Sequence, residues 1–111
     1  GGSGGTLTDT TLHTQGNTSG AGIVTTTDVT GGITILRSLF RGFGDGQGFI
    51  HAGSGALDIR YSDFTQPGED GTVNDGTVTV GSSMRDGTIT ESGGTAECAY
   101  NFTSAMTATD C

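Results

Sequence analysis

Few residues of this chain are suited to acid–base or nucleophilic catalysis. His13 and His51 are its two histidines, so one of them would have to be the base of a catalytic triad. His51, Ser54 and Asp58 make the best set, but His-Ala-Gly-Ser-Gly is not a nucleophile elbow. The strand alternation expected in this region does not bring the three groups together. We therefore expect no catalytic residues and predict that the protein is not an enzyme.

Metal binding has one candidate segment. Glu69, Asp70, Asn74 and Asp75 place four oxygen-bearing side chains in a glycine-containing loop, and such oxygens are the ligands that Ca²⁺ prefers. Their spacing is not that of an EF-hand, and an acidic turn that keeps the protein soluble would explain the same residues. If calcium is bound, we expect these four residues to be its ligands, and no other cofactor is expected.

Two covalent modifications are indicated. Asn17 and Asn101 each begin an Asn-x-Ser/Thr sequon, which predicts exposed sites for attached glycans in a secreted protein. Cys98 and Cys111 are the two cysteines of the chain, and a disulfide between them would hold the C-terminal tail. Because disulfides persist in oxidising compartments, we predict an extracellular or cell-surface location.

The charge balance excludes several partners. The net charge is −8, with twelve acidic residues against four basic ones, all arginine. Four scattered arginines cannot neutralise a row of phosphates, so we expect no binding to nucleic acid or to anionic membranes. The sequence has no apolar run long enough to span a bilayer, so no membrane insertion is expected.

The elements that would carry these residues are predicted to be β-strands. The chain has 22 glycines, one proline and many threonines, a composition typical of strands joined by tight turns. Residues 57–64 alternate apolar and polar side chains, as in a half-buried strand. Gly31-Gly32 predicts a two-residue hairpin turn. Asp-Gly-Thr occurs three times at unequal spacing, which favours a β-meander over a solenoid.

The first residues are predicted to be separate from the domain. Residues 1–22 form a flexible N-terminal arm in this interpretation, and residues 23–111 form one β domain. The arm carries Leu7, Thr8, Thr10 and Leu12, which we expect to add as a strand to the sheet edge of a neighbouring copy. Leu7 and Leu12 fall on opposite faces of a regular strand, so a bulge or a single anchor would be needed. Repeated addition produces a helical homopolymer.

With its acidic, Thr/Gly-rich composition, its cysteine pair and its leading GGSGGTLTDTTLHT segment, the chain resembles pilin-like subunits that assemble by donor-strand exchange. That resemblance implies a single immunoglobulin-like β-sandwich, completed by the N-terminal strand of a neighbour, in an extracellular filament or pilus. The alternative is a monomeric extracellular module that binds carbohydrate or calcium through its Gly/Asp loops.

Overall fold

The computed structural model of the chain describes residues 5–13, 21–27, 29–41, 47–65, 69–85, 87–103 and 105–109. These residues form fourteen strands and no helix, so this part of the chain contains no helix that could cross a membrane. The strands are β1 (Gly5–Thr8), β2 (Thr11–His13), β3 (Ala21–Thr25), β4 (Ile33–Leu36), β5 (Leu39–Arg41), β6 (Gln47–His51), β7 (Ala56–Arg60), β8 (Asp63–Phe64), β9 (Glu69–Val73), β10 (Thr77–Gly81), β11 (Thr88–Glu91), β12 (Thr95–Ala99), β13 (Asn101–Phe102) and β14 (Ala108–Thr109).

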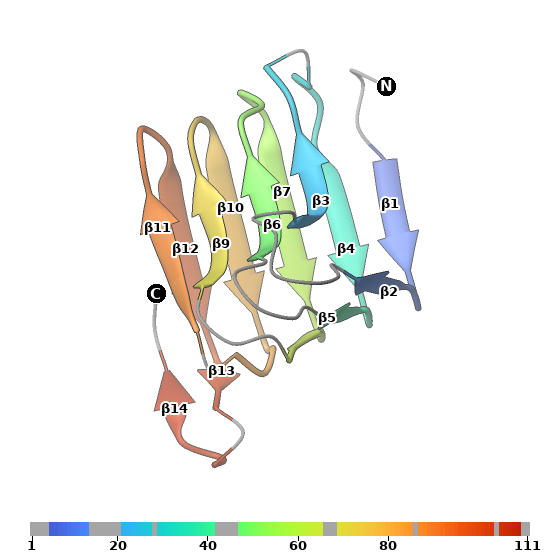
Figure 1. Cartoon of the computed structure of the whole chain (residues 1–111), viewed down its shortest axis with the longest axis vertical. Coiled ribbons are helices and arrows are strands. Elements are labelled where there is room, and N and C mark those ends of the chain that lie inside the picture. The colour runs from blue at the N-terminus through green and yellow to red at the C-terminus, as the bar shows by residue number, and fades with distance from the viewer. Residues whose placement is uncertain are drawn as a thin grey trace.

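The strands wind into a solenoid in which successive coils lie side by side (Figure 1). Sheet A has the order β1-β4-β7-β10-β12, sheet B the order β2-β5-β8, and sheet C the order β3-β6-β9-β11. All strand pairs within these three sheets are parallel. The chain passes through A, B and C in turn, and then begins the next coil. A short antiparallel pair, β13 and β14, follows the last strand of sheet A.

This architecture confirms the predicted all-β class, but the predicted immunoglobulin-like sandwich is wrong. A sandwich is built from antiparallel hairpins, whereas here each strand pairs with the equivalent strand of the next coil. Gly31-Gly32 shows the difference: β3 before it belongs to sheet C, and β4 after it belongs to sheet A. Two glycines allow a sharp turn in either case, so they mark a corner of the solenoid and not a hairpin.

The described part of the predicted arm is the first coil of the solenoid. β1 pairs with β4 of the same chain, with Leu7 opposite Ile35, and β2 pairs with β5. Leu7 packs half-buried against the core. Residues 5–13 are therefore paired within their own chain, and the division at residue 22 does not mark a boundary between an arm and a sandwich.

Apolar side chains fill the interior in columns that run along the solenoid axis. Because side chains alternate in a strand, every second residue of sheet A points inward. The columns place larger residues in the middle coils and smaller ones toward the C-terminal end. One column is Leu7, Ile35, Ile59, Val80 and Cys98, and the other is Gly5, Ile33, Leu57, Val78 and Ala96.

Aromatic rings fill the space between the sheets. Phe40 of β5 and Phe64 of β8 stack with ring centroids 4.3 Å apart and planes 6° apart, and Phe49 of β6 meets Phe64 edge-on at 6.3 Å. Gly71 of β9 makes room for the Phe49 ring, because a Cβ at that position would lie 2.3 Å from the ring. The three rings are fully buried or nearly so.

A charged pair continues this aromatic column. Met84 pairs with Asp63 of β8 in an isolated parallel bridge. Phe64 and Arg85 are the residues that follow these two, so the Arg85 side chain takes the interior position in its coil that Phe64 takes in the preceding one. Its Nε lies 3.0 Å from Oδ2 of Asp70, and both side chains are at most 1% exposed. The solenoid therefore holds an ion pair inside its core.

Candidate functional site

The corner between sheets A and B has the same shape in every coil. Two residues connect sheet A to sheet B in each of the first three coils, and in all five coils the residue that follows the sheet A strand has a positive φ of 49° to 61°. Non-glycine residues adopt this left-handed conformation rarely and at a cost of about 1 kcal/mol or more. Its recurrence indicates that the fold imposes it. The column of left-handed residues is Asp9, Arg37, Tyr61, Ser82 and Tyr100.

The second residue of each corner forms a polar ladder beneath that column. Thr10 N–H donates to Ser38 Oγ at 3.3 Å, Ser38 N–H to Ser62 Oγ at 3.1 Å, Ser62 N–H to Ser83 Oγ at 3.1 Å, and Ser83 N–H to Asn101 Oδ1 at 3.0 Å. Each hydroxyl donates in turn to the carbonyl two residues earlier, at 2.8 to 3.1 Å. The ladder fixes successive coils in register.

Ser62→Ala is expected to lower the free energy of unfolding by about 1–3 kcal/mol, because it leaves the buried N–H of Ser38 without its acceptor. Thr10→Ala is the matched control: its hydroxyl bonds only the Thr8 carbonyl among the described contacts and is exposed. We expect its loss to stay below about 1 kcal/mol. Urea unfolding measures both, and equal losses would contradict a role for the ladder.

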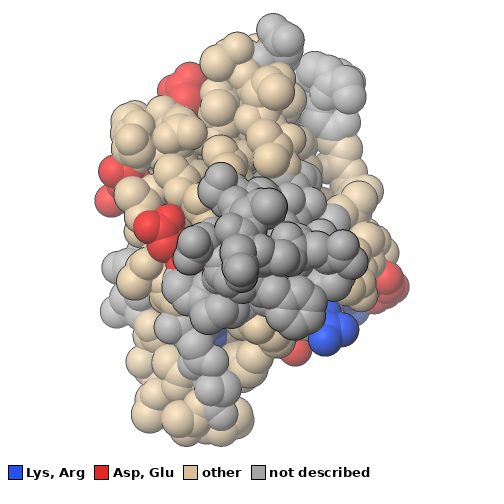
Figure 2. Space-filling view, viewed as in Figure 1, with Lys and Arg blue, Asp and Glu red and all other residues tan. Residues whose placement is uncertain are grey.

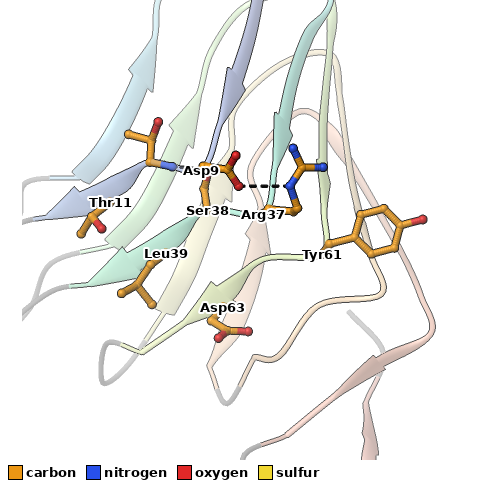
Figure 3. Close-up of a pocket in the computed structure, with 8 residues that line it drawn as sticks. Asp9, Thr11, Arg37, Ser38, Leu39, Tyr61 and Asp63 are labelled. Carbon is orange, nitrogen blue, oxygen red and sulfur yellow. Dashed lines mark hydrogen bonds and ion pairs between the residues drawn. The ribbon is translucent and has the colours of Figure 1, made fainter.

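A groove of about 390 Å³ lies beside the left-handed column, where the corner meets sheet B (Figure 3). Its corner side is supplied by two consecutive residues from each of the first two coils and by one from the third. Its sheet side is supplied by one residue from each of β2, β5 and β8, in register. The lining residues are Asp9, Thr10, Thr11, Arg37, Ser38, Leu39, Tyr61 and Asp63.

The groove is suited to binding a polar ligand by hydrogen bonds. Asp9 and Asp63 offer carboxylate oxygens as acceptors, while Arg37 donates from Nε to Asp9 Oδ1 at 3.0 Å. Both members of that pair are more than half exposed. Ser38 is no activated nucleophile, since its hydroxyl donates to a backbone carbonyl and the described lining residues include no histidine or cysteine. Figure 3 shows the Tyr61 ring extending outward from its strand end.

No family model, curated protein or solved structure matches this chain. The role of the groove therefore has to be inferred from the residues that line it.

The best catalytic set from the sequence is not assembled. His51 is fully buried, and its Nε2 lies 2.9 Å from the carbonyl oxygen of Gly55. Because a carbonyl can only accept, Nε2 carries the proton, and Nδ1 accepts from the Thr25 hydroxyl at 2.7 Å. Ser54 is exposed at the corner, and Asp58 pairs with an arginine two residues on. His51 is thus a structural residue, while the side chain of His13 lies outside the described set.

The four predicted calcium ligands do not lie together. Glu69 is exposed at the start of β9, whereas Asp70 points into the core toward Arg85. Asn74 and Asp75 follow the other end of the same five-residue strand. Among the described residues, no three His, Cys, Asp or Glu side chains are grouped as metal ligands. The reason is that residues 69–73 form strand β9 and not a loop, so Glu69 and Asp70 point to opposite faces and Asn74 and Asp75 lie a strand length away.

Of the four residues predicted to carry modifications, the structure describes Asn101 and Cys98. Asn101 is 3% exposed, and its amide accepts from Ser83 N–H and donates to the Val80 carbonyl at 2.8 Å. It is therefore not the exposed glycan site that its sequon predicted. Cys98 lies half-buried in β12. Asn17 and Cys111 lie outside the described residues, so that glycan site and the disulfide stay predictions.

Sequence reasoning missed the left-handed column and the ladder. A four-residue sequence pattern marks them in each coil. It consists of an apolar residue, then any residue, then the left-handed residue, and last Thr, Ser or Asn. The five instances are Leu7–Thr10, Ile35–Ser38, Ile59–Ser62, Val80–Ser83 and Cys98–Asn101.

Proposed function

We propose that the protein is an extracellular structural subunit whose copies stack end to end into a filament. The observation that carries this proposal is the parallel sheet A, because no further described strand pairs with the outer side of β1 or of β12. The β12 edge of one copy and the β1 edge of the next run in the same direction and can continue the sheet. Such a contact joins two different surfaces and does not close, so it generates a filament.

The first edge presents unused backbone groups. Gly5 donates its N–H to the carbonyl of Gly32, just before β4, and Asp9 donates to that of Leu36 in β4, each at 3.1 Å. Because these groups alternate along a strand, the N–H groups of Thr6 and Thr8 point to the open side. Leu7 is only half-buried, so a stacked copy would also bury apolar surface at this end.

The opposite edge is partly protected. Thr95 donates its N–H to the carbonyl of Gly76 at 3.0 Å, so the N–H groups of Ala96 and Cys98 point away from β10. Glu91 Oε2 accepts the Ala96 N–H at 2.8 Å. An incoming β1 strand would have to replace that hydrogen bond, so we expect Glu91 to slow stacking.

The charge distribution argues against a nucleic-acid partner. On the face seen in Figure 2, the basic side chains of the described residues form no continuous track. The net charge of −8 keeps single subunits soluble. An extracellular location follows from the predicted disulfide.

Thr6→Pro tests the contact directly. Proline removes an outward N–H and blocks an incoming strand, yet it breaks no bond to β4. We expect filaments of the unchanged protein and of Thr6→Ala by negative-stain electron microscopy, and none of Thr6→Pro. Circular dichroism checks that the proline variant is folded. Monomers of the unchanged protein at every concentration, by sedimentation velocity, would overturn the proposal.

Glu91→Ala is expected to shorten the lag before filaments form, because it frees the Ala96 N–H for a stacking strand. Glu91→Gln is the matched control, since its amide oxygen can still accept that N–H, and it should keep the slower kinetics. Light scattering follows both reactions. Slower assembly of Glu91→Ala would mean that Glu91 supports the edge and does not protect it.

A further inference from the structure

Two tyrosines stand on one line along the solenoid axis. Tyr61 and Tyr100 are 61% and 88% exposed, among the most exposed large apolar side chains of the described residues. Both belong to the left-handed column, with Ser82 between them: Tyr61 N–H bonds Gly81 O, and Ser82 N–H bonds Ala99 O. Since neighbouring parallel strands lie about 4.8 Å apart, the two backbones are separated by about 10 Å.

This arrangement has no evident structural reason. A left-handed position favours glycine or asparagine, and a bulky aromatic residue there is unusual. Neither ring is buried, so neither contributes much to the core. Ser82, which lies between them in the column, has a small side chain, and the groove lined by Tyr61, Arg37 and Asp63 continues the column beyond Tyr61.

We propose that this corner binds a neutral, extended polysaccharide chain that lies along the solenoid axis. Tyrosines present flat apolar faces and a polar tip, and a pyranose ring has an apolar face rimmed by hydroxyls. Sugar rings stack on Tyr61 and Tyr100, with one sugar spanning Ser82. The next sugars enter the groove, where Asp9 and Asp63 accept hydrogen bonds and Arg37 donates them.

Charge selects the neutral class of chain. The protein carries −8 overall, and the groove contains two carboxylates against the one guanidinium of Arg37. A polyanionic chain would be repelled by that field. An uncharged chain satisfies the same donors and acceptors without that repulsion.

The test is isothermal titration calorimetry with cellohexaose, xylohexaose and mannohexaose as neutral probes and hexagalacturonate as the anionic one. We expect at least one neutral hexaose to bind and the anionic probe to bind at least tenfold more weakly. Tyr61→Asn and Tyr100→Asn should each weaken binding about tenfold, because asparagine keeps the left-handed conformation but removes the ring. Tyr61→Phe keeps the ring face and should retain most of the affinity.

Met106→Asn is the matched control, because Met106 is also left-handed and 78% exposed but lies outside the column. It should bind as the unchanged protein does. No binding of any neutral probe, unchanged affinity in both Asn variants, or preference for the anionic probe would each overturn the proposal. These results do not depend on whether filaments form, since Thr6→Pro subunits can be titrated in the same way.

Discussion

Replacing Asp70 by leucine is expected to lower the free energy of unfolding by about 3–5 kcal/mol, because it leaves the guanidinium of Arg85 buried without its carboxylate. Arg85 is 1% exposed and ranks among the largest fully buried side chains. Its Nε lies 3.0 Å from Asp70 Oδ2. Urea unfolding of the purified variant, followed by circular dichroism, measures the loss.

The double variant Asp70→Leu/Arg85→Met is the control for this prediction. Exchanging a whole buried ion pair for apolar residues of similar volume is often neutral or stabilising. We therefore expect the double variant to recover most of the stability that Asp70→Leu loses. A single variant as stable as the unchanged protein would contradict the prediction, as would a double variant less stable than the single one.

The ion pair also bears on how the fourth coil is positioned. Arg85 occupies an interior place that Phe40 and Phe64 hold in the preceding coils, and Asp70 reaches it from sheet C. An apolar pair would fill this space without requiring one particular partner. A charged pair makes shifted arrangements costly, since each of them would bury an uncompensated charge.

Local patterns in the sequence predicted the strands but not their partners. The alternation predicted for residues 57–64 was correct for 57–60, where Leu57 and Ile59 are fully buried and Asp58 and Arg60 form an ion pair. The predicted strand was too long, because β7 ends at Arg60 and Tyr61 is an exposed corner residue. Alternation is set by the pleat of a single strand, so it can be predicted without knowing which strand lies beside it. Parallel pairing joins residues a whole coil apart, and nothing local specifies it.

The repeat was hidden because the coils shorten along the chain. Leu7 pairs with Ile35, 28 residues on, but later steps in the same column are 24, 21 and 18 residues. Two residues link sheets A and B in each of the first three coils, whereas the connections at the other two corners vary in length. A search for a fixed period therefore fails, although the short segment around each A–B corner recurs five times.

The predicted calcium and catalytic sites were not found as predicted, because local sequence does not specify which residues meet in the folded chain. Glu69 and Asp70 are neighbours in sequence but lie on opposite sides of the sheet, because they belong to strand β9 and not to a loop, and successive side chains of a strand alternate between its faces. His51 meets Thr25 across 26 residues of sequence. The groove collects side chains from three coils, so its lining could not be predicted before the coil register was known.

Phe64→Ala is expected to lower the free energy of unfolding by about 3–5 kcal/mol, because the lost ring leaves a cavity in a rigid column. Phe64 is 1% exposed, stacks on Phe40 and meets the edge of Phe49. It therefore joins sheets B and C as well as neighbouring coils. Thermal or urea unfolding measures the effect.

Phe102→Ala is the matched control, because Phe102 is only half-buried, on the short strand β13, and its loss should be much smaller. The two variants also separate the interior from the proposed filament contact, since neither changes β1. Where Phe64→Ala remains folded, at low temperature, it should still form filaments. Loss of filaments from a folded Phe64→Ala subunit would show that stacking depends on the packing of the middle coils and not only on the open edges of sheet A.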